Sequence, residues 1–274
     1  MAHELQERYS KLVDAKLRAT LVKKDGVIFN NRYEGSPTAG SVKVPVRDTE
    51  VAVNAYSKTA GANPTHGDTS YITVAVDKDY AVNEIIDGFD AAAVPDNLVA
   101  DRLDSAGYSL ALQIESDATS VLVAAATKMA STTASTAETA YDTIVDARAE
   151  LGKVHVPNDG KRFLLAHPDF YSLVLKDKEH FVHATALGDE VIKTGAVGKI
   201  AGFLVFEDSS LPESVEFIVG HPNWCTRVNE WMVPVKLQDL AGSGKYIGAS
   251  AVQGRRIYAH KVTKPKTLLK KTTA

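Results

Sequence analysis

The stretch from Ser41 to Val76 constrains the fold more than any other, because it can bury very little of itself. Apolar and polar residues alternate from Ser41 to Arg47 and again from Val51 to Ala55, and a return strand is expected from Tyr71 to Val76. Pro45 cannot donate a ladder hydrogen bond, so the first strand is expected at a sheet edge. Lone two-stranded hairpins are marginal in water. We therefore expect this long hairpin to lie on another surface, such as that of a second subunit.

Length and composition indicate an ordinary folded protein. The 274 residues fit one large or two modest domains. The net charge of -3 argues against a dedicated nucleic-acid binder, which would be strongly basic. The one cysteine, Cys225, cannot form an internal disulfide, which favours a reducing compartment. The sequence near Met1 lacks a signal-peptide core, and no apolar run reaches about 18 residues, so we expect no membrane span and folding in a cytoplasm.

Two segments carry helical periodicity. Apolar residues recur every three or four positions in Ala2 to Thr20, which predicts an amphipathic N-terminal arm that needs another surface to pack on. A longer apolar stripe, Val99 to Ala125, predicts a helix from Asp96 to about Met129. Gly107 lies inside this helix and weakens it. We expect the stripe to pack on a sheet of its own subunit rather than to form a coiled-coil seam.

Short elements follow a small polar linker, Ser131 to Ala137, which is a candidate domain boundary. Ser135 and Glu138 have capping-box spacing, so a helix is expected to begin there and to end near Leu151. Apolar runs and turn residues predict the remaining elements. These are a strand at Arg162–Ala166, a helix from Pro168, glycine-punctuated strands at Gly195–Phe206, a strand at Glu216–Val219, and two strands, Trp231–Leu237 and Ala249–Val262, pairing across a Gly242-Ser243-Gly244 turn.

Two motifs that suggest chemistry have simpler structural explanations. A phosphate-binding loop needs Gly, four residues and then Gly-Lys-Ser or Gly-Lys-Thr. Here Gly198-Lys199 is followed by Ile200, which favours tight turns between strands. Cys225 suggests a nucleophile paired with a histidine, but it follows an apolar strand beside Trp224, which favours a thiol in the core.

Two charged features also leave alternatives. His180 and His183, with Asp177 and Glu179 nearby, can share a helix face and bind a metal, but no third-ligand motif accompanies them, so a solvated or interface pair is favoured. From Arg255 to Lys271 there are basic residues and no acidic ones. This basic tail either contacts packaged DNA through phosphates or is a solvated or subunit-facing strand end, and the second is favoured.

Three segments together resemble the tailed-bacteriophage major capsid proteins, which share the Hong Kong-type coat fold. Gly195 to Pro212 is similar to the family's glycine-rich pair of strands, which is followed by a turn of two small residues, Leu and Pro. Leu165 to Leu173 is similar to the family's strand-then-helix segment, and Val219 to Trp224 to its next strand and turn. The order of the elements agrees with the family over nearly the whole chain.

The resemblance implies an α+β protein with the tailed-phage major capsid fold. Its parts would be an N-terminal arm (1–30), an extended β-hairpin loop (31–80), a peripheral β domain with a long spine helix (81–130), an apical α/β domain (131–230), and a return to the peripheral domain (231–274). Some family members carry a scaffolding extension before the arm. This chain shows none, so a separate scaffolding protein, or none, is expected.

The resemblance also implies a structural function and not an enzyme, with no cofactor and no metal. Many copies would form pentamers and hexamers and close into an icosahedral virion capsid around double-stranded DNA, assembled in the host cytoplasm. A portal and a scaffolding protein are the expected partners, with weak non-specific DNA contact. An encapsulin-like nanocompartment shell is the alternative within the same fold, and a cytoplasmic enzyme around His180 and His183 is the alternative of another class.

The residues expected to act in assembly fall into two groups. In the extended loop, contacts to a neighbouring subunit are expected from Val51, Val53, Tyr56, Lys58, Asn63 and His66. In the apical domain, the family's glycine motif corresponds to Gly195, Gly198, Gly202 and Phe203.

Overall fold

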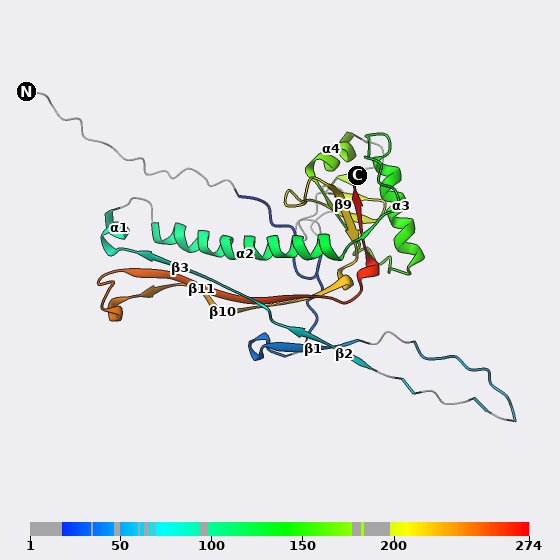
Figure 1. The fold of residues 1–274 in the computed structure, drawn as a ribbon, viewed down its shortest axis with the longest axis horizontal. Helices are drawn as coiled ribbons and strands as arrows, with labels where there is room; N and C mark the ends of the chain where they lie inside the picture. Colours follow the sequence, from blue (N-terminus) through cyan, green and yellow to red (C-terminus); the bar gives the residue numbers. More distant parts are fainter. Residues whose placement is uncertain are drawn as a thin grey trace, which may run out of the picture.

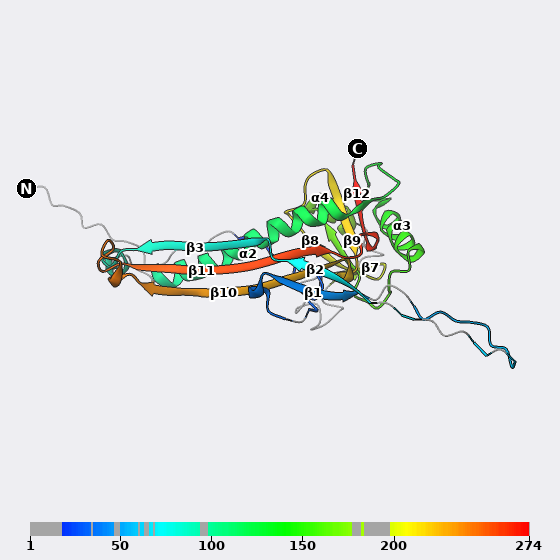
Figure 2. The same cartoon turned by 60° about the horizontal axis from the view of Figure 1, so that its bottom comes forward.

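The computed structural model describes residues 18–33, 35–46, 50–59, 61–62, 66–67, 69–93, 98–176, 182–183 and 198–273. One long helix, α2 (Leu98–Ala125), lies along a three-stranded sheet and ends at a compact part that holds a seven-stranded sheet (Figure 1). Figure 2 shows a two-stranded hairpin projecting from the region where these two parts meet. The α+β class is therefore confirmed. Most of the helix expected at Ala2 to Thr20 lies outside the described residues, and Arg18 to Thr20 are not helical.

The hairpin forms at its base, where its apolar residues find a partner surface. Strands β1 (Ser41–Val46) and β2 (Ser70–Ala75) pair antiparallel, with Val42 opposite Val74. Both valines are buried, and they pack against residues of the neighbouring three-stranded sheet. The expected resumption of the strand at Val51 to Ala55 is wrong, because the described residues 50–56 form no strand. The described residues 50–59 are all exposed, so no packing within the described part of the chain holds them in register with a return strand.

The three-stranded sheet is built from β10 (Cys225–Asp239), β11 (Ser250–Val262) and β3 (Lys78–Ile86), all antiparallel, with β11 in the centre. The expected pairing of the last two strands around a glycine turn is confirmed. β3 was not expected from the sequence. It follows the hairpin directly, alternates between exposed and half-buried positions, and ends at α1 (Gly88–Ala93).

Helix α2 is a single rod whose apolar stripe is buried within its own subunit. At 1.5 Å per residue, its 28 residues span about 42 Å. Ala106, Leu110 and Ile114 are buried on the side of the three-stranded sheet, which confirms the expectation of sheet packing. Gly107 does not interrupt the helix, because burial of the neighbouring stripe outweighs a glycine cost of about 1 kcal/mol.

The seven-stranded sheet separates two apolar cores. Its strands, in spatial order, are β4 (Thr127–Lys128), β12 (Leu268–Thr272), β9 (Val215–Gly220), β5 (Phe163–Ala166), β8 (Phe203–Glu207), β7 (Gly198–Ile200) and β6 (Val182–His183). One core holds α3 (Ala140–Lys153) and α4 (Pro168–Lys176). The other holds the C-terminal half of α2 and the chain around Phe29. Alternate residues of β5 enter opposite cores, Leu164 the first and Leu165 the second, as strand geometry requires.

Two expectations about local structure need correction. The capping box at Ser135 and Glu138 does not form, because the helix begins at Ala140 and the Ser135 amide and hydroxyl both donate to Glu216. A tertiary acceptor therefore competes successfully with the local one. The end of the basic tail is not free either, because β12 is a sheet strand between β4 and β9. Lys271 is buried there, and its ammonium group donates to the carbonyl and hydroxyl oxygens of Ser131.

Candidate assembly surfaces

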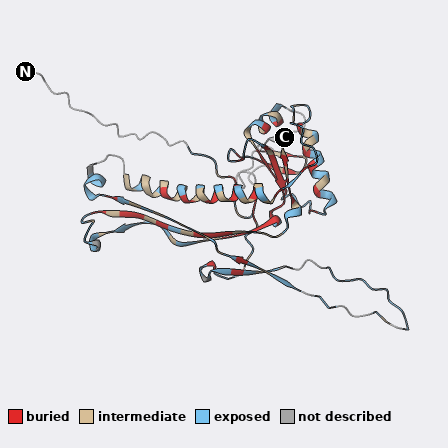
Figure 3. Ribbon diagram, viewed as in Figure 1, coloured by how far each residue is buried: buried red, intermediate tan, exposed pale blue. Residues whose placement is uncertain are grey.

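The extended loop presents its apolar side chains to solvent. Val51 is 87% exposed, Val53 98% and Tyr56 76%. Figure 3 shows that exposed residues follow the loop far from the body of the protein. Lys58 and His66 are also exposed, while Asn63 lies outside the described residues. The structure thus brings the described members of the expected set onto one projecting segment, where they touch no buried core.

A small backbone turn orders part of this loop. The amide of Ser57 donates to the carbonyl of Gly61, and the amide of Gly61 donates back to the carbonyl of Ser57. Gly61 has a φ of +70°, a conformation that glycine adopts without strain. Lys58 lies inside the turn. Local hydrogen bonds therefore shape the turn, while Val51 and Val53 before it remain almost fully exposed.

The glycine motif of the apical domain has a structural role. Ala201 and Gly202 have φ values of 45° and 86° and form the two-residue turn between β7 and β8. The Arg148 guanidinium of α3 donates to the carbonyl of Ala201 at 2.9 Å, and Phe203 is fully buried. Gly198 is buried in β7, while Gly195 lies outside the described residues. The described part of the motif therefore serves tight strand turns, as expected, and offers no phosphate cradle.

The N-terminal arm is anchored by a buried ionic cluster that sequence reasoning missed. The Lys23 ammonium lies 3.2 Å from Glu115 Oε1 of α2 and 2.5 Å from Asp208 Oδ2 after β8. It also donates to the Ser210 hydroxyl at 2.7 Å, and the backbone amides of Val22 and Lys23 donate to Glu115. Glu115 stands among apolar neighbours of the helix stripe, and that position was the one available signal in the sequence.

The next residues of the arm complete the core of the compact part. Phe29 is fully buried, and its ring centroid lies 5.2 Å from that of Trp224. The Trp224 indole donates to the carbonyl of Ile28, and the Arg227 guanidinium lies over the Phe29 ring at 4.5 Å. This part of the arm is therefore packed within its own subunit. The segment of the arm that needs another surface is shorter than the sequence alone indicated.

The far end of the three-stranded sheet carries a second exposed apolar surface, which we call the distal tip. Phe89 of α1 is 79% exposed, and Ile247 of the β10–β11 connection is 83% exposed. Their neighbours Gly88 and Gly248 are in backbone contact, since a Cβ added at Gly88 would lie 2.3 Å from the Gly248 carbonyl oxygen. The glycine at position 88 therefore permits the close approach of α1 to the β10–β11 connection, at one end of the molecule (Figure 1).

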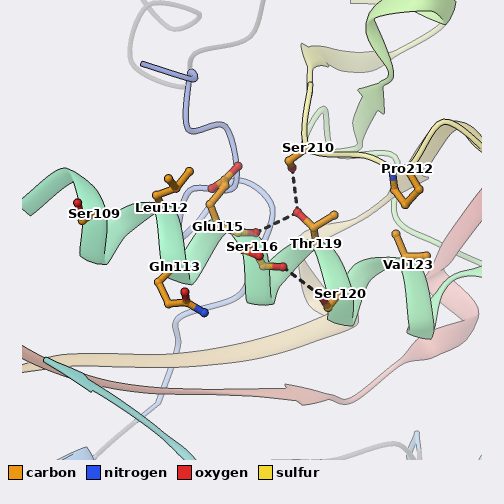
Figure 4. Close-up of a pocket in the computed structure, with 10 residues that line it drawn as sticks. All are labelled: Ser109, Leu112, Gln113, Glu115, Ser116, Thr119, Ser120, Val123, Ser210 and Pro212. Atoms are coloured by element: carbon orange, nitrogen blue, oxygen red, sulfur yellow. Dashed lines mark hydrogen bonds between the residues drawn. The ribbon is translucent and has the colours of Figure 1, made fainter. Parts of the chain in front are cut away.

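A groove runs along one face of α2, between Ser109 and Val123. It has a volume of about 730 Å³ and is lined mainly by small hydroxyl and apolar side chains of the helix (Figure 4). Ser210 and Pro212, which follow β8, line it as well, and Ser210 lies opposite Thr119. Glu115 lies at its edge, where it also holds the arm.

The chemical alternatives gain no support from the described residues. Within the ranges that the structure describes, no cluster of three or more potential metal ligands occurs. The expected pair cannot be tested, because His180 lies outside these ranges and only the backbone of His183, in β6, is described. Cys225 is fully buried, and burial raises the pKa of its thiol to about 12, which confirms a core thiol rather than a nucleophile.

The basic tail is largely engaged within the subunit. Arg255 forms an exposed ion pair with Asp79 of β3, and the Arg256 guanidinium lies over the Trp231 ring at 4.7 Å. Lys270 donates to the carbonyl of Val123 near the end of α2. The exposed cations of this tail include Lys261 and Lys266. Separately, none of the helices in the described part of the chain combines the length and apolarity needed to cross a bilayer.

Comparisons with known proteins agree on one fold. A family model described as "Phage capsid protein" matches residues 85–270. A search of curated proteins gives no match. A solved chain of Mycobacterium phage Che8 superposes with a TM-score of 0.70 at 18% identity, over 97% of this chain and 96% of that one. For the capsid structure of Cyanophage P-SCSP1u the values are 0.74, 13%, 98% and 93%, and for the capsid of a native GTA particle 0.68, 12%, 98% and 95%. These structural likenesses show a common fold.

Proposed function

This chain belongs to the phage capsid protein family and is a shell-forming major capsid protein, and we propose that exposed segments of each subunit drive its assembly. Many copies form pentamers and hexamers that close into an icosahedral shell around double-stranded DNA. Heterologous contacts whose rotation closes generate rings, and many weak contacts add up through multivalency. The match to phage capsid proteins does not favour an encapsulin-like shell or an enzyme, so we propose a purely structural role.

The exposed extended loop is the observation that carries this proposal. Burying one valine side chain contributes about 1.5–3 kcal/mol, and the loop leaves both Val51 and Val53 almost fully in water. A second subunit that covers the loop recovers this free energy. The buried base at Val42 and Val74 holds the loop to its own subunit, so that the outer residues reach beyond it. Tyr56, Lys58, Asn63 and His66 extend the proposed contact.

The distal tip supplies the contact between capsomers in this proposal. The molecule is elongated, and the end of the long sheet opposite the compact part holds α1, which carries Phe89, and the β10–β11 connection, which carries Ile247 (Figure 1). We assign the compact part to the apical domain near the capsomer axis, with the boundaries expected from the sequence. The pairing of β12 with β9 adds Leu268–Thr272 to that part. A subunit with its compact end at the axis places the distal tip at the capsomer rim.

The remaining partners are inferred from family membership. A portal and a scaffolding protein, assembly in the host cytoplasm and weak DNA contact belong to this proposal on that ground. Exposed Lys261 and Lys266 suit non-specific phosphate contact. The buried Lys271 does not, because its ammonium group is already bound inside the protein.

Electron microscopy of the unchanged chain and of a loop variant with two substitutions, each expressed by itself, tests the proposal. The unchanged chain is expected to form shells, tubes or capsomer rings. Val51→Asp/Val53→Asp places two charges where an apolar contact is needed and should leave only small species. Val154→Asp, at an exposed apolar position on the compact part, is the matched control and should assemble normally. Normal shells from the loop variant would overturn the role of the loop, and a compact monomer from the unchanged chain would overturn the proposed assembly.

A further inference from the structure

We propose that a cleft between the end of the N-terminal arm and the compact part binds phosphate groups. The cleft lies where residues 26–32 pass the loop 159–161 and the short helix η3 (Pro222–Trp224). Two adjoining hollows form it, with volumes of about 230 and 240 Å³, and both are lined by Asn30, Arg32 and Asn223. The residues of the cleft all belong to one subunit, so this inference does not depend on the proposed assembly.

The Arg32 guanidinium is the first sign of a missing ligand. Within the described ranges it has no ion pair and no hydrogen bond, and only the backbone amide of Arg32 donates to another residue. Every other arginine in those ranges binds an oxygen of the subunit. A guanidinium carries several donors in one plane, which matches the oxygens of a phosphate group.

The other charges of the cleft also favour an anion. Lys161 lines the first hollow, and among the described residues no carboxylate pairs with its ammonium group. Lys264 lines the second hollow. The exposed amide side chains of Asn31 and Asn223 add neutral donors. With Arg32, the lining holds three cationic side chains against one carboxylate, that of Asp159.

The carboxylate of Asp159 is already engaged by the protein. Its Oδ1 accepts from the Lys161 amide at 3.1 Å and lies 3.3 Å from Nε2 of the buried His221. The Nδ1 of His221 accepts from the Asn223 amide, so the proton of the ring lies on Nε2 and is donated to Asp159. These donors compensate part of the negative charge, and the two cations of the first hollow remain available to an anion.

Both sides of the cleft are held in place without a ligand. The Arg32 amide donates to Asn30 Oδ1 at 2.9 Å. The Asn30 amide donates to the carbonyl of Cys225, and its carbonyl accepts from the Arg227 amide. On the opposite side, Gly160 has a φ of +79°, which lets the loop turn between Asp159 and Lys161. Binding therefore requires little ordering of the backbone, which favours affinity.

The size and polarity of the hollows indicate a compact anion. Pockets for drug-sized ligands have volumes of about 300–1,000 Å³ and are mainly apolar. Each hollow here is smaller, and most of its lining side chains are polar. Because Arg32 lines both hollows, two linked phosphate groups can share it. A free diphosphate or two successive phosphates of a nucleic acid strand have this chemistry.

Isothermal titration calorimetry of the full-length chain with diphosphate, at constant ionic strength, tests this inference. We expect saturable binding to one site per subunit. Arg32→Gln and Lys161→Gln should each weaken binding about tenfold or more, because each removes a hydrogen bond between charged groups. Lys153→Gln removes an exposed lysine elsewhere on the compact part and is the matched control. Asp159→Asn removes the opposing charge and should tighten binding, a change that general damage to the fold would not produce.

Binding that does not saturate would overturn the inference. Equal losses in Arg32→Gln and Lys153→Gln would also overturn it, because they would show general attraction of an anion. Arg32 and Lys161 are exposed, so thermal unfolding without diphosphate should be unchanged in both variants. This check separates loss of the site from loss of the fold.

A short single-stranded oligonucleotide identifies the source of the phosphates. Displacement of diphosphate by the oligonucleotide, lost in Arg32→Gln, would support the site and assign it to nucleic acid. Failure to displace diphosphate would support the site and assign it to free phosphates. Normal shells from a chain that binds no diphosphate would overturn the site and leave the proposed function intact.

Discussion

Lys23 and Asp208 form an ion pair inside the protein, with 2.5 Å between the ammonium nitrogen and Oδ2 and almost no exposure of either side chain. This contact is an ion pair, and Asp208 Oδ2 does not accept a well-aligned hydrogen bond. Glu115 adds a second carboxylate on the same ammonium. One cation therefore joins three distant segments of the chain, namely the arm, α2 and the end of β8.

Replacing Lys23 should destabilise the subunit strongly. Lys23→Met leaves the carboxylates of Glu115 and Asp208 buried without a cation, and losing one partner of a buried pair costs about 3–5 kcal/mol. Urea unfolding followed by circular dichroism measures the change. Lys24→Met removes an exposed neighbouring lysine and should alter the free energy of unfolding by less than about 0.5 kcal/mol. Equal effects of the two variants would show that the ion pair contributes little.

His260 should make stability depend on pH below neutrality. Burial, followed by the positive charge of Arg227, lowers the pKa of His260 from 6.5 to about 4, and its Nε2 is buried without a partner. The unfolded chain then binds a proton that the folded chain does not, so this contribution falls as the pH drops from about 6.5 to 4. The contribution of His260 to the free energy of unfolding changes by about 3 kcal/mol across this window and does not change with pH outside it.

The measurement is a series of urea unfolding curves between pH 4 and 8. His260→Leu removes the titrating group and should flatten the curve in this window relative to the unchanged chain. His66→Leu, in the exposed loop, is the control and should leave the curve unchanged. The assignment would fail if both variants kept the slope of the unchanged chain.

A methyl group at position 220 should be costly. A Cβ at Gly220 would lie 2.7 Å from Leu268 Cδ1, 3.0 Å from the Thr267 carbonyl oxygen and 3.1 Å from Phe163 Cζ. Backbone cannot yield as a flexible side chain can, so Gly220→Ala should destabilise by about 1–3 kcal/mol. At Gly242 a Cβ meets nothing within 4 Å, and Gly242→Ala is the matched control. Thermal unfolding compares the two.

Charges at the distal tip should stop assembly at an intermediate stage. Phe89→Asp/Ile247→Asp removes the apolar tip that we assign to contacts between capsomers, while the extended loop stays intact. We expect capsomer rings without closed shells in electron micrographs and in sedimentation velocity. Val154→Asp again serves as the control. Closed shells from the tip variant would assign the tip another role.

Sequence reasoning succeeded where local pattern and packing agree. The stripe of α2 predicted both its helix and the burial of residues such as Leu110 and Ile114 against a sheet. The alternation around Val42 predicted β1 correctly. This strand forms because an apolar surface lies against its inner side. The same alternation at Val51 and Val53 predicted a strand that does not form, because both side chains are almost fully exposed and pack on no surface in the described part of the chain. A period in the sequence shows which residues share a face, but it does not show whether anything covers that face.

The sequence by itself determined the family, the order of the elements and the turn chemistry, because helix and strand periods, glycine turns and proline positions act over a few residues. Only the tertiary structure decided which charges are buried and which segments remain uncovered. Lys23, Glu115 and Asp208 carry no local sign of their meeting. Phe89 and Ile247 share a tip only because two backbones touch at Gly88 and Gly248. Burial and ion pairing depend on distances between residues far apart in the chain, and the fold alone sets those distances.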